Sequence, residues 1–218
     1  SVYVDEMPVP FSIMSGFANL DVSRTEVLKG PQGILFGNNA TGGAVNYIAN
    51  KPSDEFSAEV ELGYSRFQTV DFDGYVNIPV SDSLAVRLAA RTTQSDGWQT
   101  STTTGEELGE RDLSIGRLSV AWDPGDRVRA LGTITYAEDQ SDAIAPQFFR
   151  AVVQNAQTPL DQGFVNFPAA GSNNREADWS SCINNSPTED PSGCVSLASD
   201  NEYLHSNLRI EVDLTDSV

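Results

Sequence analysis

The sequence predicts a mostly β protein in which a short glycine-rich unit precedes antiparallel strands of a transmembrane β-barrel. Three observations predict this fold class. After residue 52 the chain consists of segments in which apolar and polar side chains alternate, which is the pattern of strands with one apolar and one polar face. The connections between these segments alternate between short and long. No apolar stretch approaches the roughly 20 residues that a membrane-spanning helix needs.

Alternating segments follow one another from residue 56 to the end of the chain. In the first, for example, Val60 and Leu62 alternate with Glu59 and Glu61. Charged side chains fall on the polar faces of these segments, whereas a charge on a lipid-facing position would cost about 2–4 kcal/mol at the membrane midplane. The predicted strands cover residues 56–64, 70–80, 84–91, 117–122, 127–137 and 204–214.

The connections support a barrel that crosses an outer membrane. Short turns are predicted at 81–83 and 123–126, and long loops at 95–112 and 138–202. Short turns on one side and long loops on the other are typical of outer-membrane barrels, and so long a loop is uncommon in a compact soluble domain. An ordinary soluble sheet is the alternative that periodicity alone leaves open.

The charge of the chain excludes one class of partner. The 218 residues include 31 Asp and Glu against 13 Lys and Arg, which gives a net charge of −18. Such a surface repels phosphate backbones, so we expect no binding to nucleic acid. The stretch 138–202 is itself acidic, with ten carboxylates against Arg150 and Arg175. It favours a neutral or cationic ligand unless basic residues elsewhere compensate.

Neither catalysis nor a resident metal is predicted. The one histidine, His205, lies on the polar face of the last segment without a Ser or Asp partner evident from the sequence. No His, Cys and Asp side chains occur at metal-ligand spacing, so we predict no catalytic residue, no metal and no cofactor. Cys182 and Cys194 lie in a polar stretch, which favours a disulfide and an oxidising compartment over two unrelated thiols.

The glycine-rich segment runs from Arg24 to Asn46 and reads RTEVLKGPQGILFGNNATGGAVN. It predicts short strands at 26–28 and 45–49, with tight turns at the glycines. A phosphate-binding loop would need a Gly-Lys-Ser/Thr ending, and a dinucleotide site would need Gly-x-Gly-x-x-Gly spacing; neither is present.

This segment closely resembles the passage from plug to barrel in TonB-dependent outer-membrane receptors. Val2-Tyr3-Val4-Asp5 resembles a segment that lies further upstream in the same family. The chain departs from the family pattern at Glu6, Ile34 and Asn38. The matching positions of the plug motif include Gly30, Pro31, Gly37, Gly42, Gly43 and Asn46.

The resemblance implies a barrel of about 22 strands whose lumen is closed by a plug. Residues 1–52 would be the C-terminal part of the plug, and residues 53–218 the first barrel strands with their long extracellular loops. The chain is therefore expected to be a fragment, with the TonB box and the later strands outside it. The expected location is the outer membrane of a Gram-negative bacterium, in contact with its lipid.

For function, the resemblance implies active uptake of a scarce ligand, driven by TonB with ExbB and ExbD. The ligand would be a metal chelate such as a ferric siderophore, or haem, cobalamin or a carbohydrate. A surface binding or adhesion barrel without transport is the alternative. Ligand contacts are expected in the apical plug loop at Phe11, Met14 and Phe17, with packing inside the plug as the alternative role. Arg24 and Lys29 resemble plug residues that meet barrel carboxylates, with solvated surface charge as the alternative role.

Overall fold

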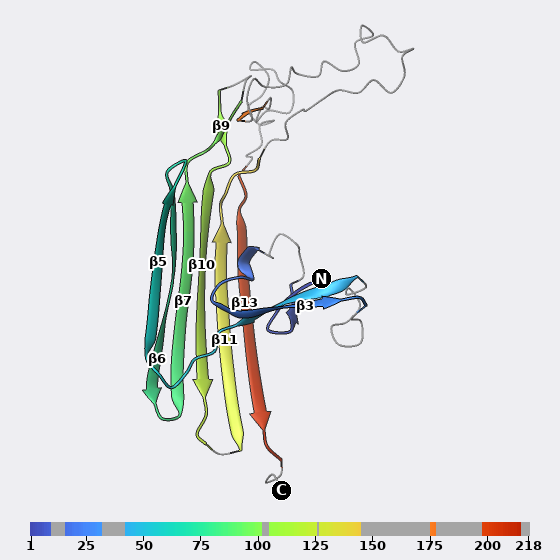
Figure 1. The fold of residues 1–218 in the computed structure, drawn as a ribbon, viewed down its shortest axis with the longest axis vertical. Coiled ribbons are helices and arrows are strands. Elements are labelled where there is room, and N and C mark those ends of the chain that lie inside the picture. Colours follow the sequence, from blue (N-terminus) through green and yellow to red (C-terminus); the bar gives the residue numbers. More distant parts are fainter. Residues whose placement is uncertain are drawn as a thin grey trace.

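A computed structural model describes residues 1–9, 16–31, 42–101, 105–125, 127–144, 175–177 and 198–214. It contains a six-stranded sheet, a four-stranded sheet and a three-stranded sheet, which we call the large, small and rim sheets. The long strands of the large sheet lie side by side, and the small sheet packs against them about halfway along their length (Figure 1).

The large sheet confirms all six predicted strands. Its strands run in the order β13-β11-β10-β7-β6-β5 and every neighbouring pair is antiparallel, so the chain passes up and down with each strand next to its predecessor. The strands are β5 (Ser57–Ser65), β6 (Thr69–Ser81), β7 (Leu84–Ser95), β10 (Arg111–Trp122), β11 (Val128–Asp139) and β13 (Asn201–Val212).

The two faces of the large sheet differ as the alternation predicts. Leu88 on β7 is 51% exposed, whereas its neighbour Arg87 is only 7% exposed. We call the face that carries Arg87 the inner wall, because the small sheet packs on it. The opposite face presents exposed apolar side chains along every strand, which suits contact with lipid. These include Val60, Leu62, Val70, Ile78, Leu88, Leu118, Ile134, Leu208 and Ile210.

The small sheet is formed by the glycine-rich unit. It consists of β1 (Val2–Val4), β2 (Met7–Pro8), β3 (Val22–Lys29) and β4 (Gly43–Ala49) in the order β2-β1-β4-β3. β1 pairs with β4 in parallel, and β3 pairs with β4 in antiparallel register. Both strands predicted in the glycine-rich segment are present, and each is longer than the sequence pattern indicated.

The rim sheet corrects the prediction that residues 95–112 and 138–202 are loops throughout. It contains β8 (Gln99–Ser101), β9 (Glu107–Leu108) and β12 (Glu176–Ala177). β12 pairs in parallel with β8, and the amide of Thr100 donates to the carbonyl of Arg175 at 2.7 Å. Strands this short carry almost no periodicity, so backbone pairing between distant segments forms them without a signal in the sequence.

Within the described ranges, the structure contains no helix that is both long and apolar enough to cross a membrane.

An apolar cluster joins the small sheet unit to the inner wall. Phe17 and Leu20, which precede β3, pack with Ala89, Ile115 and Ala137 from three strands of the large sheet. Leu20 is fully buried and Phe17 is 4% exposed. Because the wall side chains in this cluster are mostly small, the apolar contact is limited in area, and polar contacts form much of the junction around it.

Candidate functional site

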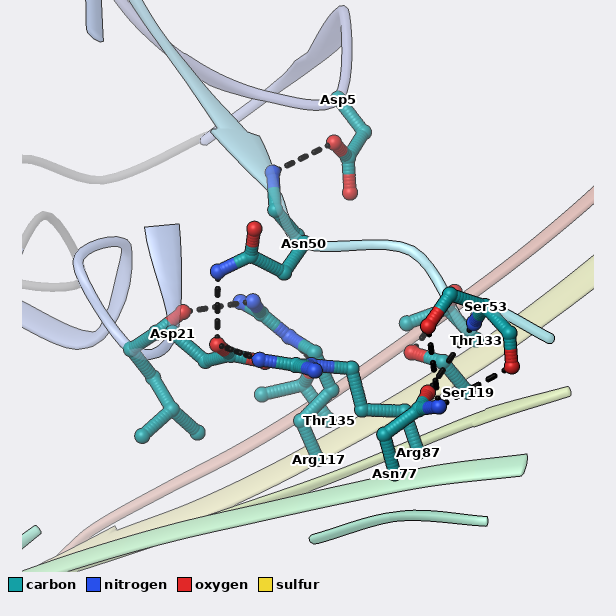
Figure 2. Close-up of polar contacts among 12 residues, drawn as sticks. Asp5, Asp21, Asn50, Ser53, Asn77, Arg87, Arg117, Ser119, Thr133 and Thr135 are labelled. Atoms are coloured by element: carbon teal, nitrogen blue, oxygen red, sulfur yellow. Dashed lines mark hydrogen bonds and ion pairs between the residues drawn. The ribbon is translucent and has the colours of Figure 1, made fainter. Parts of the chain in front are cut away.

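The candidate site is the junction between the small sheet unit and the inner wall, and Asp21 is at its centre. Arg87 of β7 donates to both carboxylate oxygens of Asp21, with Nε–Oδ2 at 2.6 Å and Nη2–Oδ1 at 2.7 Å. Asn50 adds a third hydrogen bond, from Nδ2 to Oδ1 at 2.8 Å. The side chains of Arg87 and Asp21 are 8% and 5% exposed. Figure 2 shows Asp21 between the wall and Asn50.

The β3–β4 pairing places Asp21 and Asn50 together. Val22, the first residue of β3, pairs with Ala49, the last residue of β4. Asp21 and Asn50 therefore flank the same end of the hairpin, and the amide of Asn50 donates to the carbonyl of Asp21 at 2.9 Å. Asp21 has a positive φ of 46°, a conformation that Asp tolerates better than most residues. This turn directs the chain from the wall into β3.

Arg117 of β10 is a second buried cation at the junction. It donates from Nη1 to the carbonyl of Leu20 at 2.7 Å and from Nε to Oγ1 of Thr135 at 3.1 Å. Arg117 is 3% exposed. In the described part of the chain it forms no salt bridge, and the charges of Asp5 and Asp21 act on it at longer range. The small sheet unit thus supplies a backbone carbonyl where a counter-ion would otherwise be expected.

The environment of Asp21 stabilises its charged form. Burial alone would raise the pKa of its carboxyl. The hydrogen bonds from Arg87 and Asn50, together with the positive charges of Arg87 and Arg117, outweigh burial and hold the pKa below the ordinary value of 3.8. Asp21 is therefore ionised at neutral pH and remains so in moderately acidic solution.

This lowered pKa predicts how the junction responds to acid. A carboxyl whose folded pKa is lowered contributes stability that is present above its unfolded pKa and is lost as the pH falls through the folded value. We expect the Asp21 contribution to docking to stay constant from pH 7 to about 5 and to be lost below the ordinary pKa of 3.8. Hydrogen exchange of the β4 amides in the full-length receptor measures docking, and an Asp21→Asn variant supplies the reference. A difference between the two that already shrinks between pH 7 and pH 5 would contradict this assignment.

Two further arginines of the wall contact the small sheet unit. Arg91 donates to Oδ1 of Asn19 at 2.8 Å and also pairs with Asp73 of β6. Arg209 of β13 donates to Glu6 at 2.9 Å, and this pair is exposed. At every one of these contacts the wall supplies the cation and the small sheet unit supplies an oxygen acceptor.

The connection between the two sheets is fastened by Asn77 of β6, which is fully buried. Its Oδ1 accepts from the amide of Ser53 at 3.0 Å, and its Nδ2 donates to the carbonyls of Ser53 at 3.0 Å and Glu55 at 2.6 Å. These bonds satisfy the backbone of a segment that belongs to neither sheet. They hold the entry into β5 against the wall (Figure 2).

A small cavity lies beside this connection, where the end of β4 faces β10, β11 and β13. Its volume is about 100 Å³, and its lining includes Glu6, Lys51, Ser119, Asn207 and Arg209. Because the lining is mostly polar, the cavity suits water rather than an apolar group.

The motif residues of the small sheet have structural roles. Gly30 and Gly43 have positive φ of 84° and 141° at the ends of β3 and β4. Asn46 is 1% exposed, accepts from the amide of Glu6 at 3.2 Å and donates to Glu26 at 3.3 Å. Pro31 lies just after β3, and Gly42 directly precedes β4. These residues shape the sheet.

The remaining predicted site residues are placed as follows. Arg24 pairs with Glu26 of its own strand at 2.8 Å, whereas a barrel carboxylate was expected, and Lys29 lies exposed at the end of β3. Phe17 stacks on Tyr203 of β13 with ring centroids 5.7 Å apart, so it packs against the inner wall rather than inside the plug. Five predicted site residues lie outside the described ranges, namely Phe11, Met14, Gly37, Cys182 and Cys194.

Asp21, Arg87 and Arg117 are the junction residues that the sequence interpretation missed as a site. Both arginines were assigned to polar strand faces, and Asp21 directly precedes a predicted strand, but their pairing leaves no local signal. Within the described residues, no group of three or more His, Cys, Asp or Glu side chains is placed to hold a metal ion.

A small mixed sheet docks through polar contacts on the inner wall of an amphipathic antiparallel sheet, which resembles the arrangement of plug and wall in outer-membrane receptors. The comparisons with known proteins agree with this class. No protein-family model matches the chain. The pesticin receptors of Yersinia pestis and Yersinia enterocolitica are 30% identical to it over 134 residues, which is 61% of this chain and 20% of each receptor. The ferripyoverdine receptor of Pseudomonas aeruginosa is 39% identical over 64 residues, which is 29% of this chain and 8% of the receptor.

Solved structures give the same result. The ferric yersiniabactin uptake receptor from Yersinia pestis superposes with a TM-score of 0.60 at 26% identity, covering 65% of this chain and 23% of the receptor. The ferripyoverdine receptor of Pseudomonas aeruginosa, with a TM-score of 0.53 and 22% identity over 64% of this chain and 19% of the receptor, shares the fold. The predicted resemblance to TonB-dependent outer-membrane receptors is confirmed, as is the outer-membrane location. The chain spans about a fifth of the length of the pesticin receptors.

Proposed function

We propose that this chain is the plug-to-barrel segment of a receptor that takes up a ferric siderophore across the outer membrane. In this proposal, residues 1–52 belong to the plug and residues 53–218 to the barrel. The ligand would bind at the apical plug loop, which includes Phe11 and Met14, and at the long extracellular loops. TonB, energised by ExbB and ExbD, would supply the force that rearranges the plug. The ligand passes without a covalent change, so the receptor is not an enzyme.

The observation that carries the proposal is the polar junction around Asp21. A plug must close the lumen in the resting receptor and must still leave its position when it is pulled. The Asp21–Arg87 pair is buried, so it holds the small sheet in one place. The surrounding apolar cluster is small, and the Glu6–Arg209 pair is exposed. The free energy that keeps the small sheet docked is therefore low enough for an applied force to overcome.

Uptake of iron-55 as ferric yersiniabactin or ferripyoverdine tests the proposal, because these chelates are named for the similar receptors. The full-length receptor is expressed in a host that lacks its own siderophore receptors, with and without TonB. We expect uptake of one chelate to need both the receptor and TonB, while binding at the cell surface needs the receptor alone. Binding of a chelate or of another surface ligand without TonB-dependent accumulation would favour the adhesion alternative instead.

A further inference from the structure

We propose that the inner wall carries an anion-binding arginine track, which the small sheet unit occupies with its own oxygen atoms in the docked arrangement. The arginine track consists of Arg87, Arg117 and Arg209, with Arg91 at its edge. The inference rests on the proposed function and extends it by naming the class of ligand, an anionic metal chelate with exposed oxygen atoms.

The first step of the argument is the chemistry of the docked contacts. Each arginine of the track donates to an oxygen of the small sheet unit, at distances of 2.6 to 2.9 Å. The acceptors are a carboxylate oxygen of Asp21 for Arg87, the carbonyl of Leu20 for Arg117, the side-chain oxygen of Asn19 for Arg91 and the carboxylate of Glu6 for Arg209. Carboxylate and carbonyl oxygens are also the groups that an anionic chelate presents to a receptor.

The second step is the continuity of the track across the wall. In the strand register, Ser119 lies between Arg87 and Thr133, and Thr135 lies between Arg117 and His205. The hydroxyl groups of Ser119 and Thr135, which can donate hydrogen bonds, therefore lie next to Arg87 and Arg117. The guanidinium of Arg87 lies 3.7 Å from the ring centroid of Tyr75, which fixes its orientation in the absence of a ligand.

The third step is the balance of charge after the small sheet leaves. Arg129 on the same wall keeps its own partners, Glu211 and Asp213, and Arg91 keeps Asp73. In the described part of the chain, the carboxylates that pair with Arg87 and Arg209 both belong to the small sheet unit, and Arg117 pairs with none. Displacement of the unit therefore leaves Arg87 and Arg209 without their carboxylates and Arg117 without the carbonyl of Leu20.

An anionic ligand would replace the lost partners of Arg87, Arg117 and Arg209, whereas a cationic ligand would be repelled at these three positions. The track also supplies the basic residues that the acidic stretch 138–202 lacks. It reverses the preference for a neutral or cationic ligand that this stretch alone indicates.

Cysteine labelling with reagents of opposite charge tests the track. Ser119→Cys places a thiol next to Arg87 in the full-length receptor, which also carries Asp21→Asn to loosen the junction without TonB. The purified receptor is treated with a sulfonate-bearing or a trimethylammonium-bearing methanethiosulfonate. The labelling rate of each reagent is divided by the rate at which the same reagent modifies a free thiol. Labelling of the receptor that lacks the introduced cysteine is subtracted as background. We expect the anionic reagent to be favoured by about fivefold or more.

Matched variants separate charge from structure. Arg87→Gln with Arg117→Gln is expected to remove the preference, and Arg87→Lys with Arg117→Lys to keep it. Arg129→Gln removes a cation of the same wall outside the track and is expected to change the ratio little. An unchanged preference in the double glutamine variant would overturn the proposal, as would a thiol that neither reagent reaches. Because the assay needs neither TonB nor a siderophore, its failure is distinct from a failure of TonB-dependent uptake.

Discussion

Replacement of Asp21 by asparagine is expected to weaken docking of the small sheet by about 3–5 kcal/mol. The substitution keeps the shape of the side chain but leaves the guanidinium of Arg87, which is 8% exposed, without its carboxylate. Arg117 also loses one of the two negative charges that act on it. A buried cation without a counter-ion is more costly than the pair was favourable, because its desolvation is no longer compensated.

Hydrogen exchange in the full-length receptor measures this effect, since the protection of the β4 amides reports the free energy of opening. Glu26→Gln is the matched control, because the Arg24–Glu26 pair lies in the same sheet, is exposed and does not reach the wall. It is expected to change protection by less than about 1 kcal/mol. A double-mutant cycle with Arg87→Gln should give a coupling energy comparable to the single effects. Equal loss of protection in the Asp21 and Glu26 variants would refute a special role for the Asp21–Arg87 pair.

Gly43→Ala is expected to destabilise the small sheet by about 2–3 kcal/mol. Gly43 has a φ of 141°, and an added Cβ would lie 2.6 Å from the carbonyl oxygen of Leu28. That oxygen belongs to the backbone of the paired strand β3, so it cannot move aside without a change in the pairing. The neighbouring glycine differs: a Cβ added to Gly42 would meet no atom of the described residues within 4 Å.

Gly42→Ala is therefore the control, and we expect it to be nearly neutral. The two variants are compared by urea denaturation of the full-length receptor, followed by a probe of the small sheet such as exchange protection of β3 and β4. This difference would show that a side chain is excluded by close packing at Gly43 but not at Gly42. If Gly42→Ala is as disruptive as Gly43→Ala, the close approach to Leu28 is not the reason.

Much of the large sheet could be predicted from the sequence because its two faces meet different environments. The alternation of Val60 and Leu62 with Glu59 and Glu61 places one set on the apolar outer face and the other on the inner wall. A strand has a period of two, so a few residues suffice to assign both faces. The predicted strand ends are less accurate: β10 begins at Arg111 rather than near Arg117, because its first apolar residues, Leu113 and Ile115, lie on the inner-wall face and reverse the alternation that begins at Leu118.

The partners at the junction could not be predicted in the same way. Asp21 and Arg87 are separated by 66 positions in the chain, and Glu6 and Arg209 by 203. Arg24 and Lys29 resemble junction residues in sequence, yet Arg24 pairs within its own strand and the wall arginines meet Asp21 and Glu6 instead. A charge pattern tells which residues face a polar environment, but it does not tell which opposite charge they meet there.

By itself, the sequence determined the class of the fold and the face on which each strand residue lies, because period-two alternation and glycine-dependent turns act over a few neighbouring residues. The tertiary structure alone decided the chemistry of the junction. The height and rotation at which the small sheet docks on the wall select Arg87 for Asp21 and a backbone carbonyl for Arg117. The height and the rotation of the small sheet depend on the packing of Phe17 and Leu20 against small side chains of distant strands. No local sequence pattern encodes this packing.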